Sequence, residues 1–359
     1  MTTDPHQIHR DRLVAQLRAN GVLDETWAPA FAAVPRHVLV PRWYTPSNGN
    51  WLSHTAAEDP AGAYADETLV TALDGGTVGI PTSSSTAPGL MAGMLRGLDV
   101  HDGTRVLEIG TGTGYTTALL CERLGSENVY SIDVQPEVVD AARQRLNAAG
   151  YTPTLATGDG RQRQLALDAP VERIIATCSV PYIPPAWIDQ LAQGGLILAA
   201  IDLGIESGAV ALRLNGRKLE GSFTRHTVSF MPARFPNAPT GAQRLDYAPT
   251  TATRPTRLTA GIIQDHYAYR ILLASRLPDV QRVMWTDGAE RALQLQKRDG
   301  SAWARVPLND AETSPTVTYG DTDLWAVAEQ TWTDWQLAGR PAHDTYRVTQ
   351  HDGELTIHE

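Results

Sequence analysis

The sequence has little cysteine and almost no lysine. Its two cysteines, Cys121 and Cys178, lie far apart and form no metal-ligand spacing, which excludes a disulfide-rich scaffold and a cysteine-ligated metal site. A reduced, cytoplasmic setting is therefore expected. Arginine outnumbers lysine 28 to 2, which indicates the codon usage of a GC-rich bacterial genome more than a function.

An excess of positive charge and long apolar runs are also missing. The net charge of −10 and the pI near 5.5 argue against a nucleic-acid partner, since such proteins show a basic surface, and make a basic peptide the easier partner to attract. No apolar run approaches the roughly 18 residues that a membrane helix needs, so no membrane partner is expected. Residues 1–6 lack the basic and apolar regions of a signal peptide.

The strongest positive feature is residues 106–115, Val-Leu-Glu-Ile-Gly-Thr-Gly-Thr-Gly-Tyr. A short apolar run ends in a glycine-rich turn and leads into a helix-compatible segment, a geometry typical of nucleotide-type cofactor sites. A dinucleotide motif would have its third glycine where Tyr115 stands, which disfavours an NAD-dependent dehydrogenase. Glu108 beside the turn instead suits a positively charged cofactor such as S-adenosylmethionine. An unoccupied glycine-rich turn is the alternative.

Two acidic residues follow at informative positions. Residues 128–133 form a second buried-strand candidate, and Asp133 with Val134 lies about 20 residues beyond the glycines, where α/β nucleotide sites place the acid that binds ribose hydroxyls. A third strand over 153–157 leads to Gly158-Asp159-Gly160, where Asp159 is a candidate acceptor for the adenine amino group. A solvated turn is the alternative for Asp159.

Strand and helix patterns alternate through the first two thirds of the chain. This alternation predicts an α/β fold with a mainly parallel sheet and helices on both faces. Helices are expected at 8–20, 25–34, 90–95, 116–124, 136–146 and 186–191, and further strands at 69–73, 173–178 and 196–201. A hairpin pattern over 209–223 predicts antiparallel strands at the sheet's edge.

Two segments before the glycine motif are less regular. Residues 43–63 read as an irregular loop, and long loops are often functional lids. Residues 82–86 are five consecutive hydroxyl residues, Thr-Ser-Ser-Ser-Thr, followed by Ala87 and Pro88. They form either an N-cap cluster for the next helix or, as we favour, a ligand-facing loop.

The composition changes near residue 236, which predicts a cofactor domain over 1–235 and an accessory α+β region over 236–359. In the latter we expect short strands, a hairpin turn at 298–301 and one helix, whose aromatic stripe at 324–335 packs into a core. His351 and His358 lack a metal-ligand context and are expected at the surface.

Taken together, these motifs resemble the protein-L-isoaspartate O-methyltransferases. The resemblance spans roughly residues 8–232 and rests on the segments 31–36, 64–66, 82–88, 108–114, 158–160 and 190–195, which occur in that family's order. It implies a Rossmann-like class I methyltransferase fold, S-adenosylmethionine as cofactor, S-adenosylhomocysteine as product and a peptidyl carboxylate as acceptor. No metal is expected.

The resemblance also assigns candidate site residues. The cofactor-binding candidates are Glu108, Gly110, Thr111, Gly112, Gly114, Tyr115, Asp133, Val134, Gly158, Asp159 and Gly160. The catalytic candidates, which orient the acceptor, are Thr86, Ser85, Ser84 and Ser83.

Some features depart from the repair enzymes of that family, whose loop typically reads Thr-Ile-Ser-Gln-Pro. Here Thr86 stands at the serine position, and the segments 43–63 and 236–359 are additional. In these features the chain is similar to a branch of the family that is associated with ribosomal peptide natural products (graspetides, imiditides and lanthipeptides). The leading hypothesis is therefore methylation of an aspartate in a precursor peptide, pre-cyclised or basic, leading to aspartimide or isoaspartate. Generic isoaspartate repair is the alternative, and a catalytically silent S-adenosylmethionine-fold scaffold a third.

Overall fold

The computed structural model describes residues 5–163, 165, 167–234, 250, 252–308 and 315–359. The chain divides into two compact units. The first comprises residues 1–199, 211–219 and 230–241, and the second residues 200–210, 220–229 and 242–359. The predicted boundary at residue 235 lies outside the described residues and stays a prediction. Among the described residues, no helix has the length and apolarity needed to span a membrane.

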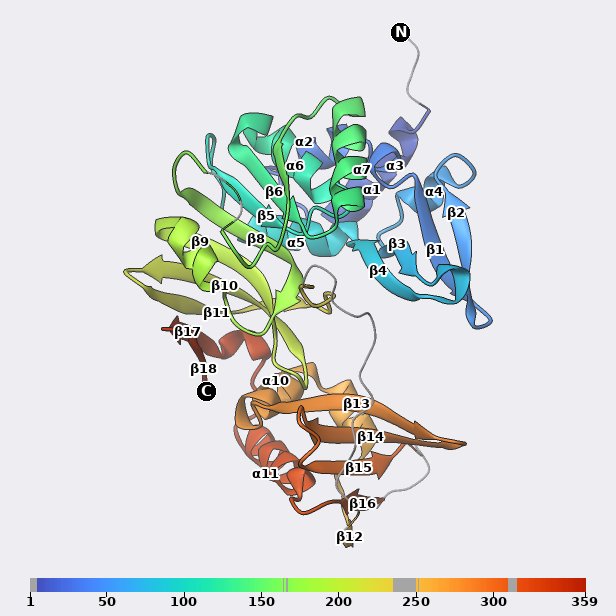
Figure 1. Cartoon of the computed structure of the whole chain (residues 1–359), viewed down its shortest axis with the longest axis vertical. Helices are drawn as coiled ribbons and strands as arrows, with labels where there is room; N and C mark the ends of the chain where they lie inside the picture. The colour runs from blue at the N-terminus through green and yellow to red at the C-terminus, as the bar shows by residue number, and fades with distance from the viewer. Residues whose placement is uncertain (1–4, 164, 166, 235–249, 251, 309–314) are drawn as a thin grey trace. The chain divides into compact units, whose positions relative to one another are not determined.

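The largest sheet has nine strands in the order β18-β17-β11-β10-β9-β8-β5-β6-β7 (Figure 1). Its strands are β5 (Val106–Ile109), β6 (Val129–Asp133), β7 (Thr154–Thr157), β8 (Val171–Val180), β9 (Leu191–Asp202), β10 (Ser207–Asn215), β11 (Lys218–Thr227), β17 (Arg347–His351) and β18 (Glu354–His358). Strand β5 pairs in parallel with β6 and β8, and β6 with β7. This arrangement confirms the predicted parallel sheet and the predicted neighbours β10 and β11, whereas β17 and β18 at the edge were not foreseen.

Helices of the first unit share a hydrophobic core with this sheet. They are α1 (Gln7–Ala19), α2 (Ala28–Ala33), α3 (Arg36–Leu39), α4 (Pro60–Ala63), α5 (Pro88–Gly97), α6 (Tyr115–Leu124) and α7 (Pro136–Ala148). Helix α8 (Pro185–Gln190) lies between β8 and β9 in the chain and buries Trp187. Short 3-10 turns lie at Gly76–Val78 and Ser126–Asn128. The core positions recur at helical spacing, as Leu13 and Leu17 do in α1, so each helix buries one apolar face.

A separate four-stranded sheet, in the order β2-β1-β3-β4, precedes the glycine motif. Its strands are β1 (Arg42–Ser47), β2 (Asn50–Thr55), β3 (Leu69–Asp74) and β4 (Ile80–Ser85). The expectation of an irregular loop over 43–63 was therefore wrong. Asn48 and Gly49 both adopt positive φ, at 49° and 77°, which makes the two-residue turn that closes a hairpin between β1 and β2.

The second unit contains an antiparallel sheet in the order β12-β16-β15-β14-β13. Its strands are β12 (Ala252–Pro255), β13 (Val280–Asp287), β14 (Glu290–Lys297), β15 (Trp303–Pro307) and β16 (Thr316–Tyr319), and its helices are α9 (Ala260–Asp265), α10 (Tyr267–Arg276) and α11 (Leu324–Leu337), with a 3-10 turn at His343–Thr345. The expectation of a single helix here was wrong, since α9 and α10 are also present. They have only six and ten residues, so each shows few turns of helical periodicity. The predicted helix α11 is present and buries Trp325 and Trp335.

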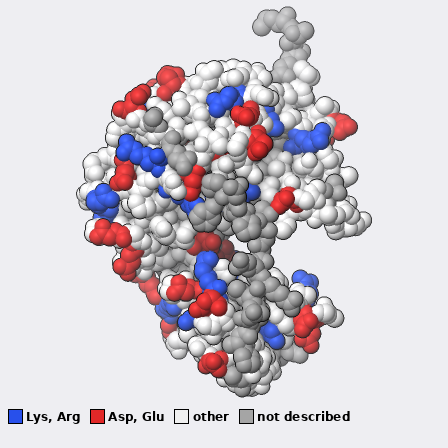
Figure 2. Space-filling model, in the orientation of Figure 1, with Lys and Arg blue, Asp and Glu red and all other residues white. Residues whose placement is uncertain are grey.

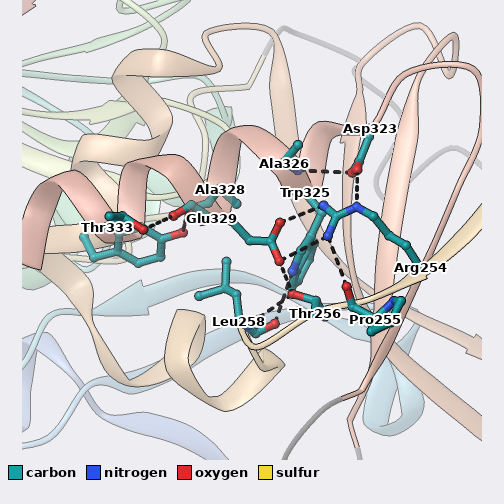
Figure 3. Close-up of polar contacts among 11 residues, drawn as sticks. Arg254, Pro255, Thr256, Leu258, Asp323, Trp325, Ala326, Ala328, Glu329 and Thr333 are labelled. Atoms are coloured by element: carbon teal, nitrogen blue, oxygen red, sulfur yellow. Dashed lines mark hydrogen bonds and ion pairs between the residues drawn. The ribbon is translucent and has the colours of Figure 1, made fainter.

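A network of charged residues joins strand β12 to helix α11 (Figure 3). Arg254 donates from Nε to Asp323 Oδ2 at 2.7 Å and from Nη1 to Glu329 Oε1 at 3.2 Å. Thr256 donates to the same Glu329 oxygen, and Trp325 Nε1 donates to the carbonyl of Leu258 at 3.2 Å. Because these groups satisfy one another, the network anchors the sheet's edge to the helix.

Candidate functional site

The glycine turn follows strand β5 and leads directly into helix α6, as the sequence predicts. Gly110, Gly112 and Gly114 have φ values of 98°, 52° and 87°, in the left-handed region that favours glycine. A Cβ on Gly110 would also lie 2.6 Å from Thr177 Oγ1. A Cβ on Gly112 would meet only the carbonyl of Ser84, at 3.8 Å, so the turn leaves open space on that side.

Asp133 lies at the end of β6, the strand next to β5. Its Oδ2 accepts from the backbone N–H of Gly112 at 3.0 Å and its Oδ1 from that of Gln135 at 3.2 Å. Parallel pairing of β5 and β6 brings this carboxylate to the turn although some twenty residues separate them in sequence. The acid and the turn that the sequence paired are therefore in direct contact.

Glu108 occupies a different place from Asp133, behind the turn. Its side chain is fully buried, and its Oε2 accepts from Ser131 at 2.7 Å and from Thr117. Oε1 has no hydrogen-bond partner among the described residues. Burial raises the pKa of Glu108 to about 7, against the opposing effect of the two hydroxyl donors. Thr111 is tied to this group through a 2.7 Å hydrogen bond with Ser131.

The Gly158-Asp159-Gly160 turn follows β7 and lies beside Asp133, whose carbonyl accepts from the Gly158 N–H at 2.8 Å. Both Asp159 oxygens accept from Arg161, at 2.9 and 2.8 Å. These hydrogen bonds hold the pKa of Asp159 below its usual range. The contact between Asp159 and the adenine amino group stays a prediction. To accept that hydrogen bond, the Asp159 carboxylate must use a lone pair that is not already occupied by Arg161.

The hydroxyl residues before helix α5 are partly a strand, which corrects the expectation of a loop. Residues 80–85 form β4 and pair with β3, and α5 begins with Pro88 after Ala87, without a side-chain cap. The alternating strand conformation separates the hydroxyls. Ser85 is 4% exposed, and its Oγ has no partner among the described residues, whereas Ser83 accepts from Thr71 Oγ1 at 3.2 Å.

A cavity of about 440 Å³ lies where the small sheet, the glycine turn and helix α7 meet. Its lining residues are Pro41, Arg42, Thr55, Thr71, Ala72, Ser83, Gly112, Thr113, Glu137, Val138, Ala141 and Arg145. The cavity brings Ser83 of the predicted catalytic set together with Gly112 of the predicted cofactor set. Ser84, Ser85 and Thr86 do not line it. Sequence reasoning missed Arg42, which directly precedes the segment 43–63 that was expected to be a loop, and Arg145, one polar residue of an amphipathic helix.

Buried Arg36 links the segments around this site and was not among the predicted site residues. Its guanidinium donates to the carbonyls of Ala63 and Ala65, both at 2.9 Å, and of Glu67 and Thr86, at 3.3 and 3.4 Å. Its Cζ lies 5.2 Å from the centre of the Tyr115 ring. Burial lowers the pKa of Arg36, and the four carbonyls compensate for the lost water. Arg36 thus positions Thr86 against the first residue of α6.

The residues that form this site lie within a match to a known family. The family model described as protein-L-isoaspartate(D-aspartate) O-methyltransferase (PCMT) matches residues 8–233. A protein-L-isoaspartate O-methyltransferase of Methanoculleus marisnigri is 34% identical over 206 residues, 56% of this chain and 80% of the relative. One of Leptothrix cholodnii is 35% identical over 227 residues, 62% of this chain and 72% of the relative.

A solved structure of a protein-L-isoaspartate O-methyltransferase shares the fold, with a TM-score of 0.57 and 21% identity. The match covers 97% of this chain and 98% of that one. It confirms the predicted Rossmann-like α/β methyltransferase fold. Because the matched span includes the region beyond residue 236, that region is not peculiar to this chain.

Proposed function

Because the chain belongs to the protein-L-isoaspartate(D-aspartate) O-methyltransferase family, we propose that it methylates the free carboxylate of L-isoaspartyl residues in peptides. Family membership confirms the predicted carboxyl O-methyltransferase and its cofactor, S-adenosylmethionine. The observation that carries the proposal is the family match over residues 8–233, within which one cavity joins Ser83 to the glycine turn.

The residues at the ends of β5, β6 and β7 fit this cofactor. The turn leaves open space at Gly112, and Asp133 presents a carboxylate beside it that suits ribose hydroxyls. The Asp133 carboxylate beside the turn also suits a cofactor with a sulfonium and an amine, whereas Glu108 is buried behind the turn and Asp159 is paired with Arg161. When bound, S-adenosylmethionine supplies an electrophilic methyl group and leaves as S-adenosylhomocysteine.

The acceptor side needs positioning more than acid–base chemistry. A carboxylate is already ionised near pH 7, so the protein has no proton to remove before methyl transfer. Holding the acceptor and the methyl group together supplies most of the rate enhancement. Ser83 accepts a hydrogen bond from Thr71, which leaves its own hydroxyl hydrogen available to donate to the acceptor carboxylate. We assign Ser83 the orienting role among the four predicted hydroxyl residues.

A second candidate is methylation of an ordinary aspartate in a ribosomal precursor peptide, with closure of the ester to an aspartimide. It is favoured by Thr86 and Ala87, which stand where repair enzymes of the family typically carry serine and glutamine. The length of the chain does not favour it, since a solved structure named for isoaspartate methylation is matched over 98% of its own length. This role remains a proposal.

Methyl transfer to three versions of one end-capped peptide separates these candidates. The peptide carries isoaspartate, aspartate or asparagine at the same position, and the methyl group of S-adenosylmethionine is isotopically labelled. We expect label in the isoaspartyl peptide and none in the asparaginyl control, which lacks the carboxylate. Label in the aspartyl peptide alone would establish the second candidate. Bound cofactor without label in any peptide would contradict both.

A further inference from the structure

Two arginines in the cavity beside the glycine turn have no carboxylate partner in the part of the chain that the structure describes. Arg145 is half-buried and Arg42 is exposed, and neither guanidinium makes an ion pair or hydrogen bond with another described residue. The third charged lining residue, Glu137, is exposed and leaves the cavity with a net positive charge. The cavity's charge is therefore opposite in sign to the protein's net charge of −10.

Arg145 differs from several other buried or half-buried arginines, which have an acidic partner. Arg173 lies near Asp99, Arg254 near Asp323 and Arg270 near Glu206, each within ion-pair distance. Burial lowers the pKa of Arg145, and no acidic group among the described residues opposes that effect. A guanidinium partly removed from water without a counter-charge is costly, so an anionic ligand there recovers free energy that a surface arginine does not offer.

The two guanidiniums reach the cavity from separate elements. Val138, Ala141 and Arg145 follow one another at helical spacing on the same face of α7. Arg42 begins strand β1, where it pairs with Thr55 of β2. Ser83 and Gly112 line the same space. An anion bound between the arginines would therefore lie in the cavity that holds the orienting hydroxyl.

The acceptor carboxylate itself is a poor match for this pair. A guanidinium that binds a carboxylate in the bidentate manner occupies both oxygens and withdraws charge from the atom that must attack the methyl group. A second, non-reacting carboxylate has no such conflict. We propose that Arg42 and Arg145 bind an acidic side chain next to the acceptor residue and thereby set the sequence preference of the enzyme. This inference rests on the proposed function.

The protein's net negative charge does not prevent the cavity from binding an acidic side chain at short range. Acidic and basic side chains are interspersed on the face shown in Figure 2. At physiological salt the screening length is about 8 Å, so distant acidic groups act weakly on a ligand held between two guanidiniums. The net charge alone favours a basic peptide as substrate. The local charge of the cavity instead favours a peptide with an acidic residue beside the acceptor.

The test compares isoaspartyl peptides that carry Glu or Gln, scanned through the flanking positions. For the wild type we expect a KM about tenfold lower for the best Glu peptide than for its Gln twin, with similar kcat, because charge-assisted hydrogen bonds are worth about that much. Arg145→Gln and Arg42→Gln should each remove most of this preference. Arg143→Gln, an exposed position on the same helix and outside the cavity lining, should retain it.

Equal KM values for the Glu and Gln peptides at every position, or loss of the preference in Arg143→Gln as well, would overturn the inference. A failure of the proposed function is seen separately, as absence of methyl transfer from the wild type to either peptide. In that case the binding of the same peptides to the cofactor-loaded protein is measured by calorimetry. Tighter binding of the Glu peptide by the wild type, but not by Arg145→Gln, supports the inference. Equal binding of the Glu and Gln peptides by the wild type refutes it. Thermal unfolding confirms that each variant is folded.

Discussion

The backbone N–H of Gly112 donates to Asp133 Oδ2 at 3.0 Å, which couples the glycine turn after β5 to the carboxylate at the end of β6. This contact holds the carboxylate next to the turn before any ligand binds. Preorganisation of this kind lowers the cost of binding, because the protein need not reorder its own groups.

Asp133→Ala should therefore weaken binding of S-adenosylhomocysteine by about 10- to 100-fold, the range for hydrogen bonds to a charged group. Titration calorimetry measures this directly. Asp140→Ala, at an exposed position on α7, is the matched control and should bind as the wild type does. Unchanged affinity in Asp133→Ala would show that this carboxylate does not hold the cofactor.

Gly110→Ala should destabilise the protein by about 2 kcal/mol or more, since alanine at a φ of 98° is strained and its Cβ would lie 2.6 Å from Thr177 Oγ1. Denaturant unfolding checks this value. Gly97→Ala, in helix α5 with nothing near its Cβ, should be neutral or stabilising by roughly 0.5 kcal/mol. Equal effects at the two positions would mean that the turn does not require its glycine.

Glu108 should make stability fall as pH rises. Its pKa is raised from 4.5 to about 7 by burial, so the folded state holds more protons than the unfolded state between these values. The free energy of unfolding should then drop by about 3 kcal/mol across that window. Glu108→Gln should abolish this contribution, and the difference between the two unfolding curves isolates it. A constant difference from pH 4 to pH 8 would contradict the raised pKa.

Arg36→Met should cost about 3 kcal/mol of stability, because four carbonyl oxygens lose their donor. We also expect kcat to fall, since the carbonyl of Thr86 loses the hydrogen bond from Arg36 that holds it next to the hydroxyl residues 82–86. Arg12→Met, at an exposed position of α1, provides the comparison. A stable but inactive Arg36→Met protein would place the role of Arg36 in positioning alone.

The hydroxyl residues are ranked by their place in the strand. Ser83→Ala should lower kcat about tenfold or more through loss of one hydrogen bond to a charged acceptor, whereas Ser84→Ala, whose side chain does not line the cavity, should have a smaller effect. Steady-state kinetics on one isoaspartyl peptide gives both values. A larger effect at Ser84 would move the orienting role away from Ser83.

Local patterns were enough to predict the glycine turn and the acidic residue that contacts it. The turn after β5 and Asp133 after β6 follow from glycine spacing and apolar runs, and parallel pairing then brings them together. The hairpin of β1 and β2 was missed because its polar residues show no apolar alternation, although the Asn48-Gly49 turn signal was present. In the folded protein this turn signal determines the structure of the segment, and the polar residues around it do not prevent the two strands from pairing.

Contacts between distant segments could not be predicted. The carbonyl partners of Arg36 lie between 27 and 50 residues away in sequence. Arg42 and Arg145 share a cavity only because the small sheet and α7 meet at the glycine turn. No pattern within one element indicates such a pairing, since each arginine alone resembles an ordinary surface residue.

The most direct test of the central claim is the ratio of kcat/KM for an isoaspartyl peptide to that for its aspartyl isomer. Both peptides have the same composition and charge, so the ratio reports only how the site holds the acceptor carboxylate. The proposed function predicts a ratio well above 100, with the methyl ester located by tandem mass spectrometry on the isoaspartyl α-carboxylate. A ratio below one would contradict it and assign the enzyme to ordinary aspartate.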